Sequence, residues 1–325
     1  MAAMTYIDAI SRAMWEEMER DPAVFLIGED IGAYGGAFKA TKGFLEHFGP
    51  ERVIDSVLSE AAIVGAATGA AVLGMRPIAE MQFADFVTCA FNQIVTNAAK
   101  IHYRWHLPAP LVLRLPTGGY IHGGPYHSSS TEGWFAHVPG LKVVAPSTPA
   151  DAMGLMKSAV RDNNPVLFFE FKYLYRRIKG DVPEGDLTVP IGKADVKREG
   201  TDATILTYGS TVHFSLEAAE IVSAEEGRQA KVVDLRTLLP LDRETILGSV
   251  RETGRALIVH EDTLTGGVGA EVAALIAEHA FDALDAPVRR LCALDAPVPF
   301  APTLEEAHLP STGAIVRALR ELMRY

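Results

Sequence analysis

The chain has 325 residues, of which 48% are hydrophobic and 22% charged, a composition typical of a globular protein large enough for two domains. A net charge of −11, without any long run of Lys and Arg, argues against a nucleic-acid partner, because phosphate binding needs clustered positive charge. Two distant cysteines exclude a disulfide framework or a zinc site of the usual spacing, and no apolar run reaches the roughly 18 residues of a membrane span.

The first half of the chain alternates short strand-like runs with helical segments. Residues 1–22 have an amphipathic helical pattern without the uninterrupted apolar core of a signal peptide, so we expect a cytoplasmic protein. We expect strands at 23–27, 53–55, 76–81, 111–115, 141–145 and 166–171, and helices at 60–73, 86–103 and 150–161. Near-continuous apolar strands that alternate with helices predict a parallel sheet covered on both faces.

The second half repeats this alternation after a change of composition. Residues 180–202 are rich in Pro, Gly, Asp and Lys, which is typical of a linker. Beyond it we expect strands at 203–208, 231–235 and 255–260, and helices at 213–226 and 269–281. The sequence therefore predicts an α/β protein with a first domain at 1–180, a linker at 181–202 and a smaller α/β domain at 203–325.

A single carboxylate, Glu60, stands at the head of a segment of small and apolar residues, EAAIVGAATGAAV. It either caps the expected helix or meets a ligand. The preceding Ser59 is a good N-cap, which leaves Glu60 available for another role. In a dry site its proton would be held more tightly, and it could exchange a hydrogen bond with a heterocycle nitrogen.

Two glycine-rich stretches are also considered as functional sites. His127 lies in TGGYIHGGPYHSSSTEGW, which is too rich in Gly, Ser and Thr to be core, so this histidine is either exposed or functional. His122, in the same loop, is equally well explained as a surface residue. The run GGVGAEV at 266–272 lacks the GxGxxG spacing after a strand, so we expect a tight approach between helices there and no dinucleotide site.

Several segments together resemble the beta subunit of the thiamine-diphosphate-dependent 2-oxoacid dehydrogenases, the decarboxylating component of the branched-chain and pyruvate complexes. They occur in one order over nearly the whole chain and include IGEDIGAYGGAF, DSVLSEAAIVGAATGAAVLGMRPIAEMQFADF, YHSSS, VVDLRTLLPLD, HEDTLTGGVGAEV and DAPVPFAP. The resemblance implies a pyrimidine-binding domain with a parallel sheet, followed by a smaller transketolase C-terminal-like domain.

The resemblance also implies an enzyme that is active only with an alpha subunit in an α2β2 heterotetramer. It would decarboxylate a 2-oxoacid oxidatively and pass the acyl group to the lipoyl group of an acyltransferase core. The run GGPYHS favours a branched-chain substrate; a pyruvate or acetoin enzyme and a non-catalytic assembly subunit remain alternatives. In the family, the alpha subunit holds the diphosphate and magnesium through a GDG motif followed by an Asn pair. No GDG occurs here, so this chain is expected to supply half of an active site.

The resemblance assigns roles to particular residues. Glu60 is implied to hydrogen-bond the pyrimidine ring of thiamine diphosphate and to favour the imino tautomer that removes the thiazolium proton. His127 is implied to handle protons while the acyl group moves to the lipoyl arm. The other implied cofactor contacts are Glu29, Leu58, Gln82 and Phe86. Phe86 would stack on the pyrimidine, although it is also explained as the first core residue of its helix.

Two points of this resemblance stay open. A potassium site is implied at Asp162 and Asn164 with the carbonyls of Leu111, Ala159 and Val160, but a turn before Pro165 explains the two polar residues equally well. The family's HSQS or HSQC run is His127-Ser128-Ser129-Ser130 here. Ser129 therefore replaces a glutamine, which puts the hydrogen bonding of the loop in doubt.

Overall fold

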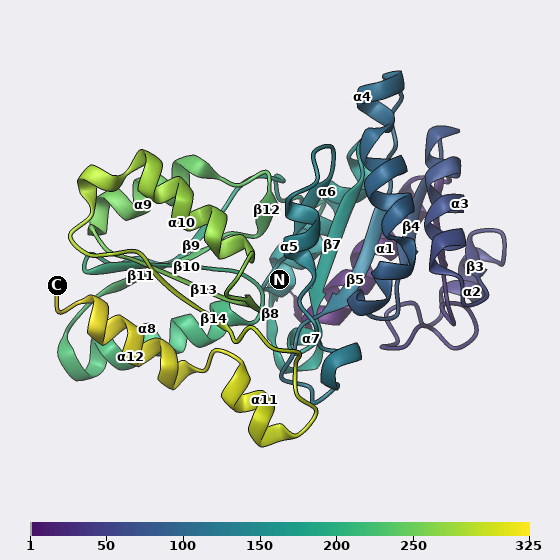
Figure 1. The fold of residues 1–325 in the computed structure, drawn as a ribbon. Helices are drawn as coiled ribbons and strands as arrows, with labels where there is room; N and C mark the ends of the chain where they lie inside the picture. Colours follow the sequence, from purple (N-terminus) through teal and green to yellow (C-terminus); the bar gives the residue numbers. More distant parts are fainter. Residues whose placement is uncertain (1) are drawn as a thin grey trace. The chain divides into compact units, whose positions relative to one another are not determined.

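The computed structural model describes residues 2–325, whose contacts divide into two units (Figure 1). The first unit comprises residues 2–117 and 134–191, and the second comprises 118–133 and 192–325. The division falls at Ile191 and Gly192, inside the segment that the sequence marks as a linker. Residues 118–133, which contain both histidines of the glycine-rich loop, pack with the second unit although they occur early in the sequence.

The first unit is built on a parallel sheet with the strand order β6-β7-β5-β4-β2-β3. Its strands are β2 (Val24–Gly28), β3 (Val53–Asp55), β4 (Arg76–Glu80), β5 (Val112–Thr117), β6 (Lys142–Val144) and β7 (Val166–Phe171). Its principal helices are α1 (Tyr6–Arg20), α3 (Glu60–Val72) and α6 (Pro149–Arg161), with shorter ones at α2 (Phe44–Phe48) and α7 (Leu174–Arg177). The central strands β5 and β7 are buried along their whole length, as a parallel sheet requires.

Two expectations for the first unit and its linker are wrong in detail. The N-terminal segment does not form one helix, because β1 (Ala2–Thr5) comes first and α1 begins at Tyr6, where the Thr5 hydroxyl accepts the Asp8 N–H at 3.2 Å. The expected linker contains strands β8 (Lys179–Val182) and β9 (Asp195–Arg198). They pair antiparallel with β1 and with β11 respectively, and such long-range pairing leaves no mark in composition.

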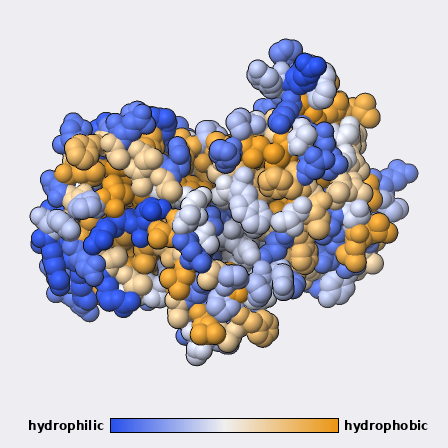
Figure 2. Space-filling view, viewed as in Figure 1, coloured by the Kyte–Doolittle hydropathy of each residue, from blue (hydrophilic) through white to orange (hydrophobic). Residues whose placement is uncertain are grey.

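The expected helix at 86–103 is also wrong as a single α-helix. The structure has a 3₁₀ segment at Ala84–Ala90, a π segment at Gln93–Asn97, a second 3₁₀ turn at Ala98–Lys100 and then α4 (Ile101–Trp105). Stiff β-branched side chains such as Thr88 and Val95 disfavour a regular helix. In Figure 1, α4 projects from its unit, and Figure 2 shows hydrophilic residues at the tip of that projection.

The second unit has its own sheet with the strand order β14-β13-β10-β11-β9, in which only β9 is antiparallel to its neighbour. The strands are β10 (Ala203–Thr207), β11 (Ala230–Asp234), β13 (Ala256–Thr263) and β14 (Arg289–Ala293), and β12 (Thr237–Leu239) follows β11. The helices are α8 (Thr211–Glu226), α9 (Arg243–Thr253), α10 (Val268–His279), α11 (Pro302–His308) and α12 (Thr312–Leu322), while α5 (Glu132–Ala136) follows the glycine-rich loop. Ile205, Val232 and Leu257 form its core with residues of α8 and α12.

The glycines of GGVGAEV do permit a close approach, but the partner is a strand and not a helix. A Cβ at Gly269 would lie 2.5 Å from His260 Nε2, and one at Gly267 would lie 2.5 Å from the Thr263 carbonyl oxygen. His260 and Thr263 belong to β13. These glycines therefore let the start of α10 pack directly on the sheet.

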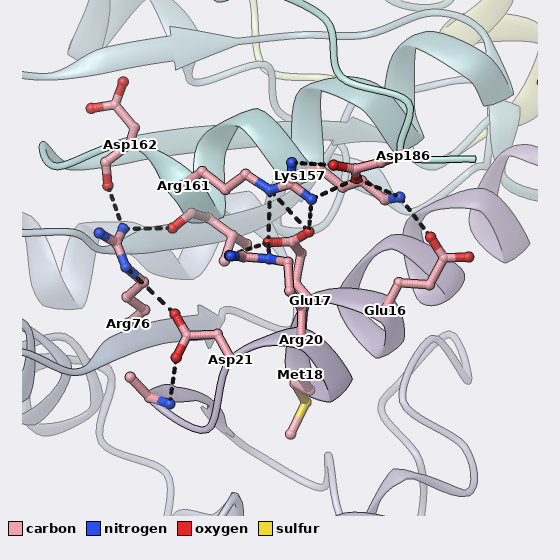
Figure 3. Close-up of polar contacts among 12 residues, drawn as sticks. Glu16, Glu17, Met18, Arg20, Asp21, Arg76, Lys157, Arg161, Asp162 and Asp186 are labelled. Carbon is pink, nitrogen blue, oxygen red and sulfur yellow. Dashed lines mark hydrogen bonds and ion pairs between the residues drawn. The ribbon is translucent and has the colours of Figure 1, made fainter.

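A network of charged side chains joins α1 and α6 in the first unit (Figure 3). The Glu17 side chain is only 1% exposed and accepts hydrogen bonds from Arg20 Nη2 at 2.8 Å and from Arg161 Nε at 3.1 Å. Arg161 also pairs with Asp186 at 2.6 Å, so the network ties the segment after β8 to the helix pair. Glu17 is the one acceptor that both arginines share.

We therefore expect Glu17→Ala to lower the free energy of unfolding by about 2 kcal/mol, because it leaves two guanidinium groups without their buried partner. Arg20 and Arg161 keep some access to water, which holds the cost below that of a fully buried pair. Urea denaturation measures the difference. Glu19→Ala is the control, since its pair with His47 is exposed and its loss should cost about 0.5 kcal/mol or less. Equal losses in the two variants would contradict this account.

Candidate functional site

Four of the expected site residues gather at one edge of the first sheet. Glu29 directly follows β2, Gln82 and Phe86 follow β4, and Glu60 begins α3 after β3. These three strands are neighbours in the parallel sheet, so their carboxyl ends meet at the same edge. Ligands of open α/β sheets bind at that edge.

Glu29 is the most deeply buried of these residues, with 4% of its surface exposed. Burial raises the pKa of its carboxyl, and the nearby charges of Glu60 and Asp30 raise it further, although the Ser59 N–H opposes the shift. Within residues 2–325, its Oε1 atom is buried and has no hydrogen-bond partner. An unpaired buried carboxyl oxygen is costly unless a ligand completes its hydrogen bonding. The structure therefore brings Glu29 and Glu60 together at a site suited to a polar ligand.

Glu60 is the first residue of α3 and is half-buried. Ser59 occupies the N-cap position as expected, but its side chain makes no capping hydrogen bond, and its φ of −160° and ψ of 81° depart from the usual cap geometry. The expectation that the Ser59 hydroxyl caps this helix is therefore wrong. Leu58, just before it, is 82% exposed and Val57 77% exposed. Figure 2 shows further hydrophobic surface on the side of the unit that contains α3 and β3.

An aromatic cluster and an amide border the two carboxyls. The Phe86 ring meets Phe83 edge-on, with centroids 5.6 Å apart, and Phe83 meets Phe38 in the same way at 5.5 Å. Phe86 is half-buried, so its ring is not simply a core residue of the segment that follows β4. Gln82 Nε2 donates to Asp30 Oδ2 at 3.2 Å, which fixes the amide beside Glu29. The segment after β4 thus supplies an aromatic ring, and an amide that is bonded to the residue next to Glu29.

His127 belongs to the second unit and is half-buried. Its N–H donates to the Gly124 carbonyl at 3.3 Å, and a Cβ at Gly123 would lie 2.7 Å from Ser128 Oγ, so the loop folds tightly beside the histidine. Ser129, the residue that replaces the family glutamine, donates its hydroxyl to the Pro125 carbonyl at 3.3 Å. The loop thus closes on itself across His127 despite the missing amide.

Acidic side chains take part in the contacts at both ends of this loop, and sequence reasoning missed them. Glu261 accepts the Gly119 N–H at 2.9 Å, and Glu305 lies 2.7 Å from His122 Nδ1. At the other end, the Tyr208 hydroxyl donates to Glu132 Oε1 at 3.0 Å. Burial, and then the charge of Asp262, raises the pKa of Glu132. No local motif could have revealed these pairs, because the partners lie far apart in the sequence.

The implied potassium site comprises Asp162, Asn164 and the carbonyls of Leu111, Ala159 and Val160. Arg76 Nη1 donates to the carbonyls of Val160 at 2.9 Å and Asp162 at 3.0 Å (Figure 3). Lys142 pairs with the Asp162 carboxylate. Arg76 and Lys142 thus bind two oxygens of the implied set, the Val160 carbonyl and the Asp162 carboxylate. The potassium site stays a prediction.

Two general features are absent from the described residues. Across residues 2–325, no group of three or more His, Cys, Asp or Glu side chains is arranged to hold a metal ion. In the same part of the chain, every helix is too short or too polar to cross a bilayer.

Two family models together match nearly the whole chain. The description "Transketolase, pyrimidine binding domain" matches residues 2–177, and "Transketolase, C-terminal domain" matches residues 192–315. Among solved structures, one titled "Split gene transketolase, inactive beta4 tetramer" aligns with a TM-score of 0.83 and 26% identity over 99% of both chains.

Characterised relatives are more similar still. The chain is 56% identical to the 2-oxoisovalerate dehydrogenase subunit beta of Bacillus subtilis, with both chains covered completely. It is 44% identical to the pyruvate dehydrogenase E1 component subunit beta of the same organism, again over both whole chains. It is 45% identical to the acetoin:2,6-dichlorophenolindophenol oxidoreductase subunit beta of Cupriavidus necator, over 97% of this chain and 96% of that one.

Proposed function

Because this chain belongs to the family of beta subunits of thiamine-diphosphate-dependent 2-oxoacid dehydrogenases, we propose that it serves a branched-chain 2-oxoacid dehydrogenase. The enzyme decarboxylates substrates such as 3-methyl-2-oxobutanoate and passes the acyl group to a lipoyl group. The observation that carries the substrate class is the 56% identity to the 2-oxoisovalerate subunit, against 44% to the pyruvate subunit of the same organism.

The edge of the first sheet has the groups that an aminopyrimidine ring needs. Glu60 would hydrogen-bond a ring nitrogen, and Glu29, whose Oε1 lacks a partner in the described chain, would accept a further donor. Phe86 would pack on the ring face, with Gln82 and Leu58 at its border. Bound there, thiamine diphosphate would supply the nucleophilic carbon and the electron sink for decarboxylation.

This chain's own contribution is to hold protons in place. A raised pKa at Glu29 keeps that carboxyl protonated to a higher pH than usual, which limits the negative charge beside Glu60. Glu60 is then free to stabilise the pyrimidine tautomer that accepts a proton. His127 would supply and accept protons during acyl transfer, because an imidazole carries both a donor and an acceptor nitrogen.

We further propose that an alpha subunit completes the site in an α2β2 heterotetramer and supplies the diphosphate and magnesium contacts. The absence of a GDG motif from the sequence supports this division, as does the exposed apolar surface at Val57 and Leu58 beside Glu60. Docking of the heterotetramer on an acyltransferase core belongs to the same proposal. A purely structural assembly subunit would need none of Glu60, Phe86 and His127, and all three are present.

Reconstitution with the cognate alpha subunit tests the proposal. We expect kcat/KM for 3-methyl-2-oxobutanoate to exceed that for pyruvate by about tenfold or more, since each apolar carbon that fills a pocket is worth roughly 1–3 kcal/mol. The isolated chain should not decarboxylate either acid. A preference for pyruvate or acetoin would move the protein to one of the related classes. If the α2β2 heterotetramer forms but turns over none of these substrates, only the role of a non-catalytic assembly subunit is left.

A further inference from the structure

We infer that Glu305 is a positioning residue for His127. It holds the glycine-rich loop of the second unit, residues 118–133, in the conformation that places this histidine. The inference rests on the proposed role of His127 in acyl transfer. Glu305 lies in α11, remote in sequence from the loop, and its side chain is only 1% exposed. A buried carboxylate of this kind needs strong partners, and the loop provides them.

Glu305 binds both the backbone and the side chain of His122. The His122 N–H lies 3.3 Å from Oε1 and 3.2 Å from Oε2, and the His122 ring Nδ1 lies 2.7 Å from Oε2. This forked contact fixes the loop five positions before His127. The His122 side chain as a whole is 46% exposed, so its ring contacts the buried carboxylate from the surface of the unit.

The neighbouring residues of this segment reinforce the contact. The Tyr120 hydroxyl donates to the Pro310 carbonyl at 2.6 Å. A Cβ at Gly119 would lie 2.5 Å from Leu309 Cδ1, and one at Gly124 would lie 3.1 Å from the Phe300 ring. The loop backbone therefore packs closely against residues 300–310, and at Gly124 its φ of 70° also favours glycine.

The backbone of the loop is also strained at two residues, and contacts outside the loop must stabilise it. Tyr120 has a φ of 60° and His122 a φ of 59°, left-handed conformations that are unfavourable for residues other than glycine. Each of these two residues makes its hydrogen bond to the 300–310 segment. Without Glu305, His122 would be free to relax, and the turn that places His127 would shift. Displacements of about 1 Å in a catalytic group commonly cost around 10²-fold in rate.

The test separates the two half-reactions of the reconstituted enzyme. We expect Glu305→Ala to lower the lipoyl-linked rate about 10- to 100-fold while decarboxylation, followed with 2,6-dichlorophenolindophenol as electron acceptor, stays within about twofold. Glu305→Gln should recover part of the loss, because its amide oxygen still accepts the His122 N–H. Glu306→Ala is the matched control, being the exposed neighbour on the same helix, and should leave both rates unchanged.

A double variant distinguishes positioning from general stabilisation. In a His127→Ala background, Glu305→Ala should cause no further loss of lipoyl-linked rate, since the group that it positions is gone. The inference would be overturned if the losses of lipoyl-linked rate in the two single variants multiply in the double variant. It would also be overturned if Glu305→Ala slows both half-reactions equally. If Glu305→Ala does not fold, Glu305→Gln and His122→Ala carry the same comparison. Should His127→Ala leave the lipoyl-linked rate intact, the proposed role of His127 fails instead.

Discussion

Glu60→Gln lowers the decarboxylation rate of the reconstituted heterotetramer by about 10²- to 10⁴-fold, the range expected when a positioned proton-transfer group is lost. The change keeps the size of the side chain and its place at the start of α3, but an amide cannot exchange a proton with a pyrimidine nitrogen. The raised pKa at Glu29 does not compensate, because that carboxyl belongs to a different position in the site. Single-turnover kinetics with 3-methyl-2-oxobutanoate measures the effect.

The same variant has a second readout that isolates the chemistry. Exchange of the thiazolium C2 proton for deuterium should slow in proportion to the decarboxylation rate, whereas calorimetric binding of thiamine diphosphate should weaken much less. Glu51→Gln, an exposed carboxylate of the same unit, serves as the control and should match the wild type. Equal exchange rates in Glu60→Gln and the wild type would end the assignment of Glu60 as the cofactor carboxyl.

His127→Ala should separate the two halves of the reaction. We expect the lipoyl-linked rate to fall by about 10²- to 10³-fold, while the dye-linked decarboxylation rate changes by less than about threefold. The reason is the role proposed for His127, which handles protons only when the acyl group moves to one sulfur of the lipoyl disulfide and the other sulfur leaves as a thiol.

A surface histidine provides the comparison for this variant. His137→Ala removes an exposed imidazole of the first unit and should leave both rates as they are. A parallel loss of dye-linked and lipoyl-linked activity in His127→Ala would assign the histidine to decarboxylation and contradict the split proposed here.

The sequence predicted the elements whose signals are local. Strand β7 occupies 166–171 as expected, and α6 begins at Pro149, where the fixed φ of proline suits the first turn. The pairing of β8 with β1 is set by residues far apart in the chain, so composition alone suggested a linker. The prediction for the segment after β4 failed for a different reason, because apolar residues three and four apart indicate a helix there but do not reveal where it changes between 3₁₀, π and α turns.

The same difference between local and long-range signals applies to the residues of the candidate site. Glu60 was conspicuous because it is one charge among small residues, and the resemblance supplied Glu29 and Phe86. Glu305 gave no such signal, because its partner His122 is remote in the sequence and only the fold brings the two together. The potassium set shows the reverse case. Its residues match the family, yet Arg76 and Lys142 bind their oxygens in the folded chain.

The assignment of residues 118–133 to the second unit has a consequence for the way this protein can be taken apart. A hybrid of two relatives joined at Ile191 and Gly192 would combine one parent's histidine loop with the other parent's Glu261 and Glu305. A hybrid that takes each unit from a single parent would need residues 118–133, between Thr117 and Trp134, from the same parent as residues 192–325. A hybrid that mixes parents between these two stretches therefore puts the loop's contacts with Glu261 and Glu305 at risk.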